Sequence, residues 1–102
     1  MAVVAKRFGK GVLSGTLQNL YTAPANATAM VKAITICNTA NNSVIVTFRF
    51  ADVSIISAHP IAANNTVTIP FIDQVIHAGE SIQGSCGQVS AISYYISGKE
   101  VT

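Results

Sequence analysis

The chain has 102 residues, of which 50% are hydrophobic and 10% are charged, and its formal net charge at pH 7 is +2. This length fits a single domain, and the small positive charge is too low for the basic footprint of a nucleic-acid-binding protein. No apolar run approaches the roughly 18 residues of a transmembrane helix, and the first residues lack the apolar core of a signal peptide. We therefore expect no membrane or nucleic-acid partner.

The low charge content is the first indication of how the surface is used. An average globular domain is about 25% charged, and that charge keeps monomers soluble and separate. A neutral surface rich in Asn, Ser and Thr tolerates close packing instead. The composition therefore favours a protein that packs against copies of itself or against a larger body, and the alternative is a secreted monomer with a polar, uncharged exterior.

The distribution of residue types predicts an all-β fold. Val, Ile and Thr supply 32 of the 102 residues, and these β-branched types suit a pleated sheet better than a helix. Short runs of them alternate with turn clusters at fairly even intervals, which is typical of a sandwich or barrel. We predict one antiparallel β-sandwich of about eight strands, jelly-roll or immunoglobulin-like, with residues 1–16 as an N-terminal arm or first strand and 17–102 as the sandwich. In chain order the expected strands are 3–13, 17–22, 29–38, 43–50, 53–61, 66–71, 81–85 and 91–97.

Local features refine four of these strands. Residues 39–43 are rich in Asn, which predicts a hairpin between the third and fourth strands. In the fourth strand, alternation places Val44, Val46, Phe48 and Phe50 together on the core face. Prolines in the fifth and sixth strands predict that both lie at sheet edges or bulges.

Further core and surface positions follow from the same patterns. Phe71, at the end of the sixth strand, is expected in the core. The last strand is expected to end at Gly98, with Tyr94 on its apolar face and Tyr95 on the opposite face.

The residues that carry catalysis or bind metals are few and scattered. The carboxylates are spread over turns, neither histidine belongs to a triad or metal motif, and the cysteines lack the short spacing of a zinc site. We therefore expect no enzyme, no catalytic residue, no cofactor, no metal, and two separate free thiols. A small hydrolase or a secreted carbohydrate-binding module stays as an alternative from another class. The residues concerned are Asp52, Asp73, Glu80, Glu100, His59, His77, Cys37 and Cys86.

Two groups of residues are candidates for an interface. Lys6, Arg7 and Lys10 form a short basic cluster that could touch an acidic surface, or be no more than a solvated strand end. Of the adjacent Tyr94 and Tyr95, one is expected to face outward, where a tyrosine is a plausible interface anchor. The alternative for it is an ordinary half-buried sheet tyrosine.

Three segments carry a resemblance to a known group of proteins. They are LYTAPANATAMVKAITICNTANNSVIVTFRF at residues 20–50, HAGESIQG at 77–84 and ISGKEV at 96–101. Their order and spacing resemble small β-sandwich virion proteins of tailed bacteriophages. The arm and residues 51–63 lie outside this resemblance.

The resemblance implies a non-enzymatic virion component made in the host cytoplasm. The leading expectation is a capsid decoration or cement protein that forms a homo-oligomer, with a trimer favoured, and that binds other virion proteins such as the major capsid protein. The alternative is a neck, collar, tail or fibre component, including one that binds a host-surface glycan. No functional residue is implied, because the shared motifs are architectural.

Overall fold

A computed structural model describes residues 2–70 and 72–102, so the core position expected for Phe71 lies outside the described residues. The described residues form strands and turns without a helix. The strands are β1 (Val3–Val12), β2 (Gln18–Thr22), β3 (Thr28–Asn38), β4 (Val44–Phe50), β5 (Val53–Ile61), β6 (Thr66–Ile69), β7 (Gln74–Ile76), β8 (Ser81–Cys86) and β9 (Ile92–Val101).

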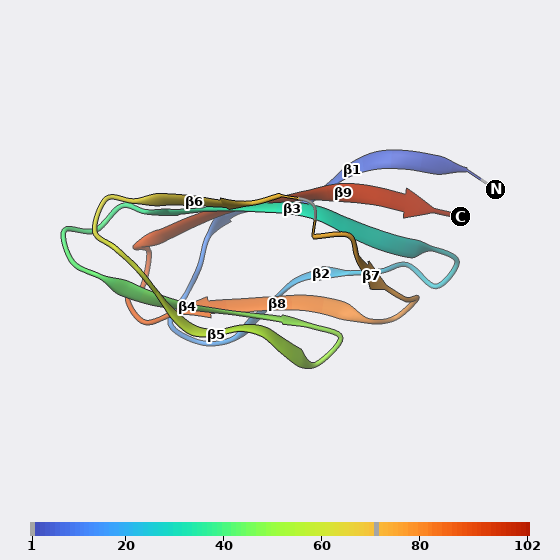
Figure 1. The fold of residues 1–102 in the computed structure, drawn as a ribbon. Helices are drawn as coiled ribbons and strands as arrows, with labels where there is room; N and C mark the ends of the chain where they lie inside the picture. Colours follow the sequence, from blue (N-terminus) through green and yellow to red (C-terminus); the bar gives the residue numbers. More distant parts are fainter. Residues whose placement is uncertain (1, 71) are drawn as a thin grey trace.

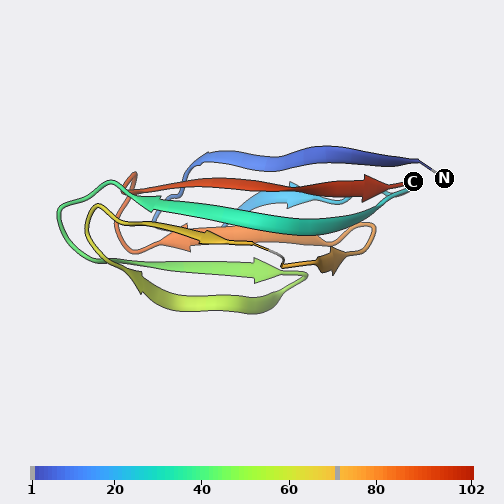
Figure 2. The same cartoon turned by 45° about the horizontal axis from the view of Figure 1, so that its top comes forward.

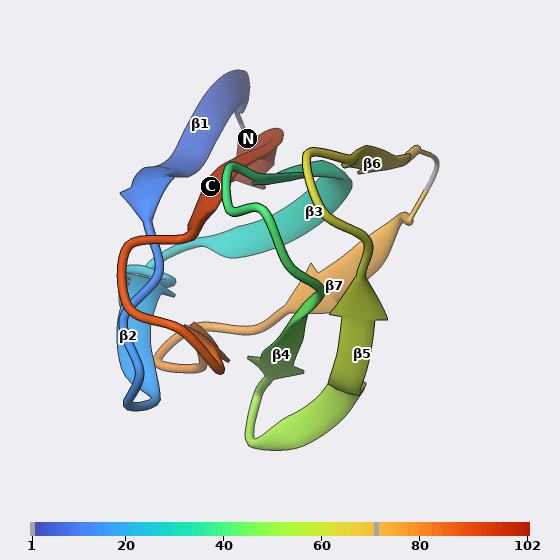
Figure 3. The same cartoon turned by 90° about the vertical axis from the view of Figure 1, so that its left-hand side faces the viewer.

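The strands form two antiparallel sheets packed face to face (Figures 1 and 2). One sheet has the order β1-β9-β3-β6, with the short β7 paired to β3 beyond the end of β6, and the other has the order β2-β8-β4-β5. The end-on view in Figure 3 separates the two layers, with β1 and β6 at the two sides of the first sheet and β2 and β5 at the two sides of the second. The prediction of an all-β antiparallel sandwich is confirmed.

The strand order is that of a jelly roll. Strands β1, β3 and β9 lie in one sheet, whereas β2, β4 and β8, which precede or follow them in the chain, lie in the other. In an immunoglobulin fold the first two strands are neighbours in one sheet, but here β1 and β2 lie in different sheets. Of the two topologies that the sequence left open, the structure has the jelly roll.

The expected hairpin at residues 39–43 is wrong. β3 pairs with β9, β6 and β7, and β4 pairs with β5 and β8, so the connection crosses from one sheet to the other. The Asn-rich segment has the right turn chemistry, but a turn does not determine which strands pair.

A tight hairpin joins β4 to β5. Its two loop residues, Ala51 and Asp52, both have positive φ, 50° and 64°, which is the backbone of a type I′ turn and matches the twist of the flanking strands. The Arg49 guanidinium donates to the carbonyl oxygen of Asp52 at 2.7 Å and holds the turn closed. β5 is an edge strand, as its proline predicted.

Two strand ends and one additional strand also differ from expectation. β6 ends at Ile69, before Pro70, and the chain then pairs again with β3 as β7, which the sequence pattern did not predict because it is three residues long. β6 is nevertheless an edge strand, as expected. β9 does not end at Gly98 but continues to Val101, because its last residues pair with β1 on one side and β3 on the other.

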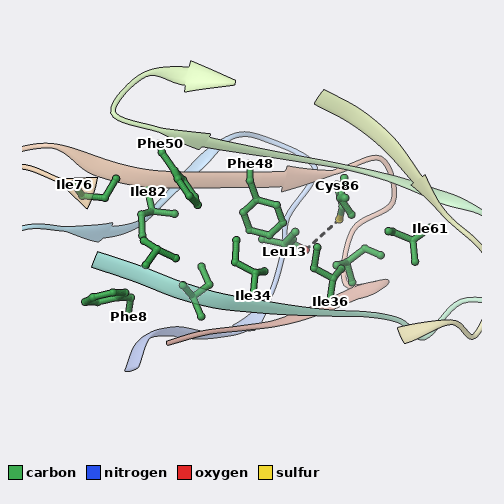
Figure 4. Close-up of a cluster of buried hydrophobic side chains, with 14 of the residues drawn as sticks. Phe8, Leu13, Ile34, Ile36, Phe48, Phe50, Ile61, Ile76, Ile82 and Cys86 are labelled. Atoms are coloured by element: carbon green, nitrogen blue, oxygen red, sulfur yellow. Dashed lines mark hydrogen bonds between the residues drawn. The ribbon is translucent and has the colours of Figure 1, made fainter. Parts of the chain in front are cut away.

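The core lies between the sheets (Figure 4). The four residues predicted for the inner face of β4 are all buried, and Phe48 is completely so. They meet Ile34 and Ile36 from β3 across the interface, with Leu13 beside Phe48 and Phe8 at one end of the cluster. Cys86 is buried among these side chains and Cys37 is half-buried, and both are free thiols, as predicted.

One polar side chain is buried in the core region. Asn38, at the end of β3, has no exposed surface. Its amide nitrogen donates to the carbonyl oxygens of Asn42 and Ile61, each at 2.9 Å, and its amide oxygen accepts from the N–H of Ala40 at 2.9 Å. The side chain thus satisfies the backbone of the crossing between the sheets, which would otherwise contain unpaired polar groups.

Candidate functional site

The predicted interface residues come from both ends of the chain, and the fold brings them together. β1 and β9 are antiparallel neighbours, with Lys10 opposite Tyr95, and Arg7 opposite Ser97. The basic cluster therefore lies beside the tyrosine pair although the two are more than 80 residues apart in the chain. β1 is paired along its length, from Val3 to Val12, so these basic residues belong to the sheet.

Arg7, Lys10 and Tyr95 share the outer face of this sheet. Residues opposite one another in a ladder point to the same side, and all three are exposed, Tyr95 by 47%. The Arg7 guanidinium carbon lies 5.8 Å from the centroid of the Tyr95 ring, within the range of a cation–π contact. Tyr95 is thus the outward tyrosine of the pair.

Tyr94 lies on the other side of β9 and packs against the core. The backbone of β1 passes close to its ring, since a Cβ atom at Gly9 would lie 3.1 Å from Tyr94 Cε2. Burial raises the pKa of the Tyr94 hydroxyl above its ordinary value. The contacts of Tyr94 are therefore those of a half-buried sheet tyrosine.

Lys6 also turns away from the outer face and joins a network that ties the two sheets together. Its Nζ lies 3.1 Å from Glu100 Oε2, and the same oxygen accepts a 2.5 Å hydrogen bond from the Tyr21 hydroxyl of β2. The Tyr21 bond and the Lys6 charge hold the pKa of Glu100 below its ordinary value. Burial, and secondarily Glu100, raises the pKa of Tyr21 far above its ordinary value.

Two further cations lie on this sheet, and no sequence pattern marked either of them as a candidate. Lys99 follows Tyr95 and Ser97 on the outer side of β9 by alternation, opposite Ala5 on β1. Lys32 is the extra residue where the register of β3 shifts between Val31 and Ala33. Both are far in sequence from the basic cluster, and only the strand order places them beside it.

Several residues of β1, β3 and β9, Lys32 among them, surround a shallow hollow of about 480 Å³ on the outer face. Two β-bulges flank it, one in β1 between Arg7 and Gly9 and one in β3 between Val31 and Ala33, and both lie next to Ser97 on the central strand. Bulges bend a strand and redirect its side chains. The hollow is lined by Ala5, Lys6, Arg7, Lys32, Tyr95, Ser97 and Gly98.

The far side of the sandwich carries a second, apolar feature. A groove of about 430 Å³ runs between edge strand β5 of one sheet and β6 of the other, and it is lined by Ile36, Val46, Ile55, Ile56, Ser57, His59, Ile61, Val67 and Ile69. Val53 and Ile55 of β5 are exposed by 59% and 46%. In Figure 3, β5 and β6 lie across the molecule from β1, so the basic hollow and the apolar groove occupy opposite sides.

The other acidic residues lie in turns or have partners within the fold. Asp52 is in the β4–β5 turn, and Asp73 lies 2.5 Å from Lys32 as its ion-pair partner. Over residues 2–70 and 72–102, no three His, Cys, Asp or Glu side chains gather in a way that would hold a metal ion. Nor do these residues form a helix that is long and apolar enough to cross a bilayer.

The three segments that carry the resemblance contact one another. Tyr21 bonds to Glu100 across the sheets, and the backbone at Ala23 bonds to that of Gly79 and Glu80. These contacts give the motif residues architectural roles. No protein family model matches the chain, and no curated protein matches it.

Proposed function

We propose that this protein is a non-enzymatic structural component of a bacteriophage virion, most simply a decoration or cement protein of the capsid. The observation that carries the proposal is the presence of two uncovered surfaces of different chemistry on opposite sides of one small sandwich, the basic hollow at β1 and β9 and the apolar groove at β5 and β6. One copy can then contact two different neighbours at once.

The fold and the composition support the same proposal. Jelly rolls are frequent among viral capsid and lectin domains, although a fold alone does not determine a function. A chain with 10% charged residues leaves most of its surface neutral, so contacts with neighbours require little desolvation of charge. The resemblance of residues 20–50, 77–84 and 96–101 to virion proteins of tailed bacteriophages supports the proposal that the chain is a virion component.

The proposed mechanism is stabilisation by mass action. A protein that binds the assembled shell, and not its dissociated subunits, shifts the equilibrium toward the shell in proportion to its binding free energy. We propose that the protein acts as a small homo-oligomer, since closed symmetric assemblies are the norm. A trimer is the expected form because it suits the threefold positions of a capsid.

The direct test is the protein composition of purified phage particles made from the genome that encodes this chain. Quantitative mass spectrometry should find the chain in many copies per particle, and particles that lack it should lose their capsid integrity at lower temperature. Particles of complete composition without the chain would refute the proposal. Light scattering on the purified protein at several concentrations tests the trimer separately.

A second candidate is a neck or tail component that binds a host-surface glycan. The observation that favours it is exposed Tyr95, which lies opposite Thr35 and one pleat from Ser97 on the outer face, since aromatic rings beside hydroxyl groups suit sugars. Binding on a glycan array that disappears in Tyr95→Ala would favour this candidate. If the protein binds no glycan on the array and is found on the capsid, the decoration or cement function is favoured.

A further inference from the structure

We infer that the hollow beside β9 is a binding site for a carboxylate side chain of an acidic protein partner. The inference rests on the proposed function, in which this face of the sandwich docks on another virion protein. It adds the chemistry of that partner and the place where its acidic group is held.

The first step is the shape of the site. The two bulges, in β1 and in β3, lie on either side of the same stretch of β9. Ser97 and Ala5 line the hollow with small side chains, which leave space between the longer side chains around them. Gly98 adds only backbone to the hollow, and its lack of a side chain serves the inner side of the sheet, where a Cβ atom would lie 2.0 Å from the carbonyl oxygen of Met30 and 2.5 Å from the buried Phe8 ring. The sheet is thus shaped to leave an open depression where a flat sheet would have none.

The second step is the charge around the hollow. Arg7, Lys6 and Lys32 all line it, although the Lys6 ammonium is turned to Glu100 on the other face of the sheet. Lys6 and Lys32 are shared with Glu100 and Asp73, but within residues 2–70 and 72–102 no carboxylate lies within ion-pair distance of Arg7. Two of the three lining cations are therefore already partnered, and Arg7 keeps an unmatched charge at the hollow.

The third step is the orientation of Arg7. Its guanidinium lies over the Tyr95 ring, and a guanidinium that stacks on an aromatic face still presents N–H groups along its edge. Such an edge matches a carboxylate with two parallel hydrogen bonds. Ser97, with a hydroxyl that can also donate, lies opposite Arg7 in the ladder.

A protein carboxylate fits these features better than a nucleic acid does. Binding to single strands uses successive aromatic platforms along a basic groove, whereas Tyr95 is the exposed tyrosine of this face, and the net charge of the chain is +2. A protein surface needs a few localised charge contacts within a largely neutral interface, and the neutral residues around the hollow supply such surroundings.

The test is a titration of the purified ¹⁵N-labelled protein with an eight-residue peptide of alternating glycine and glutamate, at low ionic strength. The amides of Arg7, Ser97 and Gly98 should shift, and binding should weaken as salt is added. Arg7→Gln should weaken binding about two- to fivefold, the range for one exposed ion pair. Ser97→Asp, which places a carboxylate in the hollow, should weaken it at least as much.

The matched control is Arg49→Gln, which removes the same charge from the other sheet and should leave binding unchanged. Equal losses in Arg7→Gln and Arg49→Gln would overturn the inference, because they would show a response to net charge alone. Amide shifts confined to other strands would also overturn it, and this readout does not depend on any variant. Tighter binding of octathymidylate than of the peptide would overturn it in favour of nucleic acid.

The peptide titration and the analysis of particle composition can fail independently of each other. If the chain is found in particles but the hollow does not bind the peptide, the inference alone fails. If the hollow binds the peptide but complete particles lack the chain, the carboxylate site stands and the virion proposal fails.

Discussion

Removal of one hydroxyl group at Tyr21 should destabilise the whole sandwich. The Tyr21 hydroxyl on β2 donates to Glu100 Oε2 on β9 at 2.5 Å, and this bond joins the two sheets near the end where the chain termini lie. The Glu100 side chain is 12% exposed and has Lys6 as its second partner. Tyr21→Phe keeps the ring and its contact with Phe8, whose centroid lies 4.4 Å away, so the variant isolates the hydrogen bond.

The expected loss follows from the charge on the acceptor. A hydrogen bond to a charged group contributes about 1.5–3 kcal/mol to the free energy of unfolding. The bond also lowers the pKa of Glu100 from its ordinary value of 4.5. A carboxyl with a lowered folded-state pKa stabilises the fold above its unfolded pKa, and this contribution is lost as the pH falls through the folded pKa. The difference between wild type and Tyr21→Phe should therefore be full at pH 7 and shrink below about pH 4.5.

At alkaline pH the contribution of Tyr21 to stability decreases as the pH rises, opposite to that of Glu100 at acidic pH. Burial and Glu100 raise the pKa of Tyr21 above its ordinary value of 10.0, so its stabilising contribution is complete below about pH 10 and declines as the pH rises further. The wild type should lose stability above that pH more steeply than Tyr21→Phe does, since the variant has no proton to lose at this position.

Urea unfolding followed by circular dichroism, at pH 7 and at pH 3.5, measures these differences. The matched control is Tyr95→Phe, which removes a hydroxyl from an exposed ring and should change the free energy of unfolding by less than about 0.5 kcal/mol. A loss in Tyr21→Phe that is equal at both pH values, or no larger than that of the control at pH 7, would refute the role given to the Tyr21–Glu100 bond.

Two substitutions and one labelling assay test the fold further. Gly98→Ala should cost at least about 3 kcal/mol, because its Cβ would lie 2.0 Å from the Met30 carbonyl oxygen; a urea midpoint equal to that of wild type would contradict this packing. Asn38→Ala should cost about 2–4 kcal/mol, since the backbone groups that it bonds lose their buried partner, and a smaller loss in urea unfolding would mean that water replaces the amide. In a thiol-reagent assay Cys37 should react in the native state and Cys86 only on unfolding; fast reaction of both would contradict the burial of Cys86.

The sequence pattern predicts the strands well and their pairing poorly. The alternation in β4 identifies its buried face, because successive side chains of a strand point to opposite faces and the apolar ones lie on the buried face. The crossing at residues 39–43 could not be distinguished from a hairpin, because Asn-rich turns serve both. The extension of β9 past Gly98 depends on its pairing with β1 and β3, and a glycine that reads as a terminator is in fact the residue that fits beside Met30.

In the candidate site, too, the sequence pattern identified single residues but not the contacts between strands. Residue types alone drew attention to the basic cluster and to the tyrosine pair, but not to their contact, since residues 7 and 95 meet only through the pairing of the first and last strands. Lys32 gave no signal in sequence, because a bulge that redirects one lysine has no pattern of its own. Alternation along β9 could therefore show which tyrosine faces outward. It could not show which strands pair, and that pairing is what assembles the site.

The sparse charge gives the basic face its significance. The net charge of +2 suggests an almost neutral molecule, yet five of the six basic residues lie on the sheet of β1, β9 and β3. Among the described acidic residues, Glu100 and Asp73 each face one of these cations, which leaves Arg7, Lys10 and Lys99 without a carboxylate within ion-pair distance. On a highly charged protein three such residues would be ordinary. On this sparsely charged surface they dominate the local electrostatic potential. A partner with an acidic patch would therefore be oriented toward this face before contact.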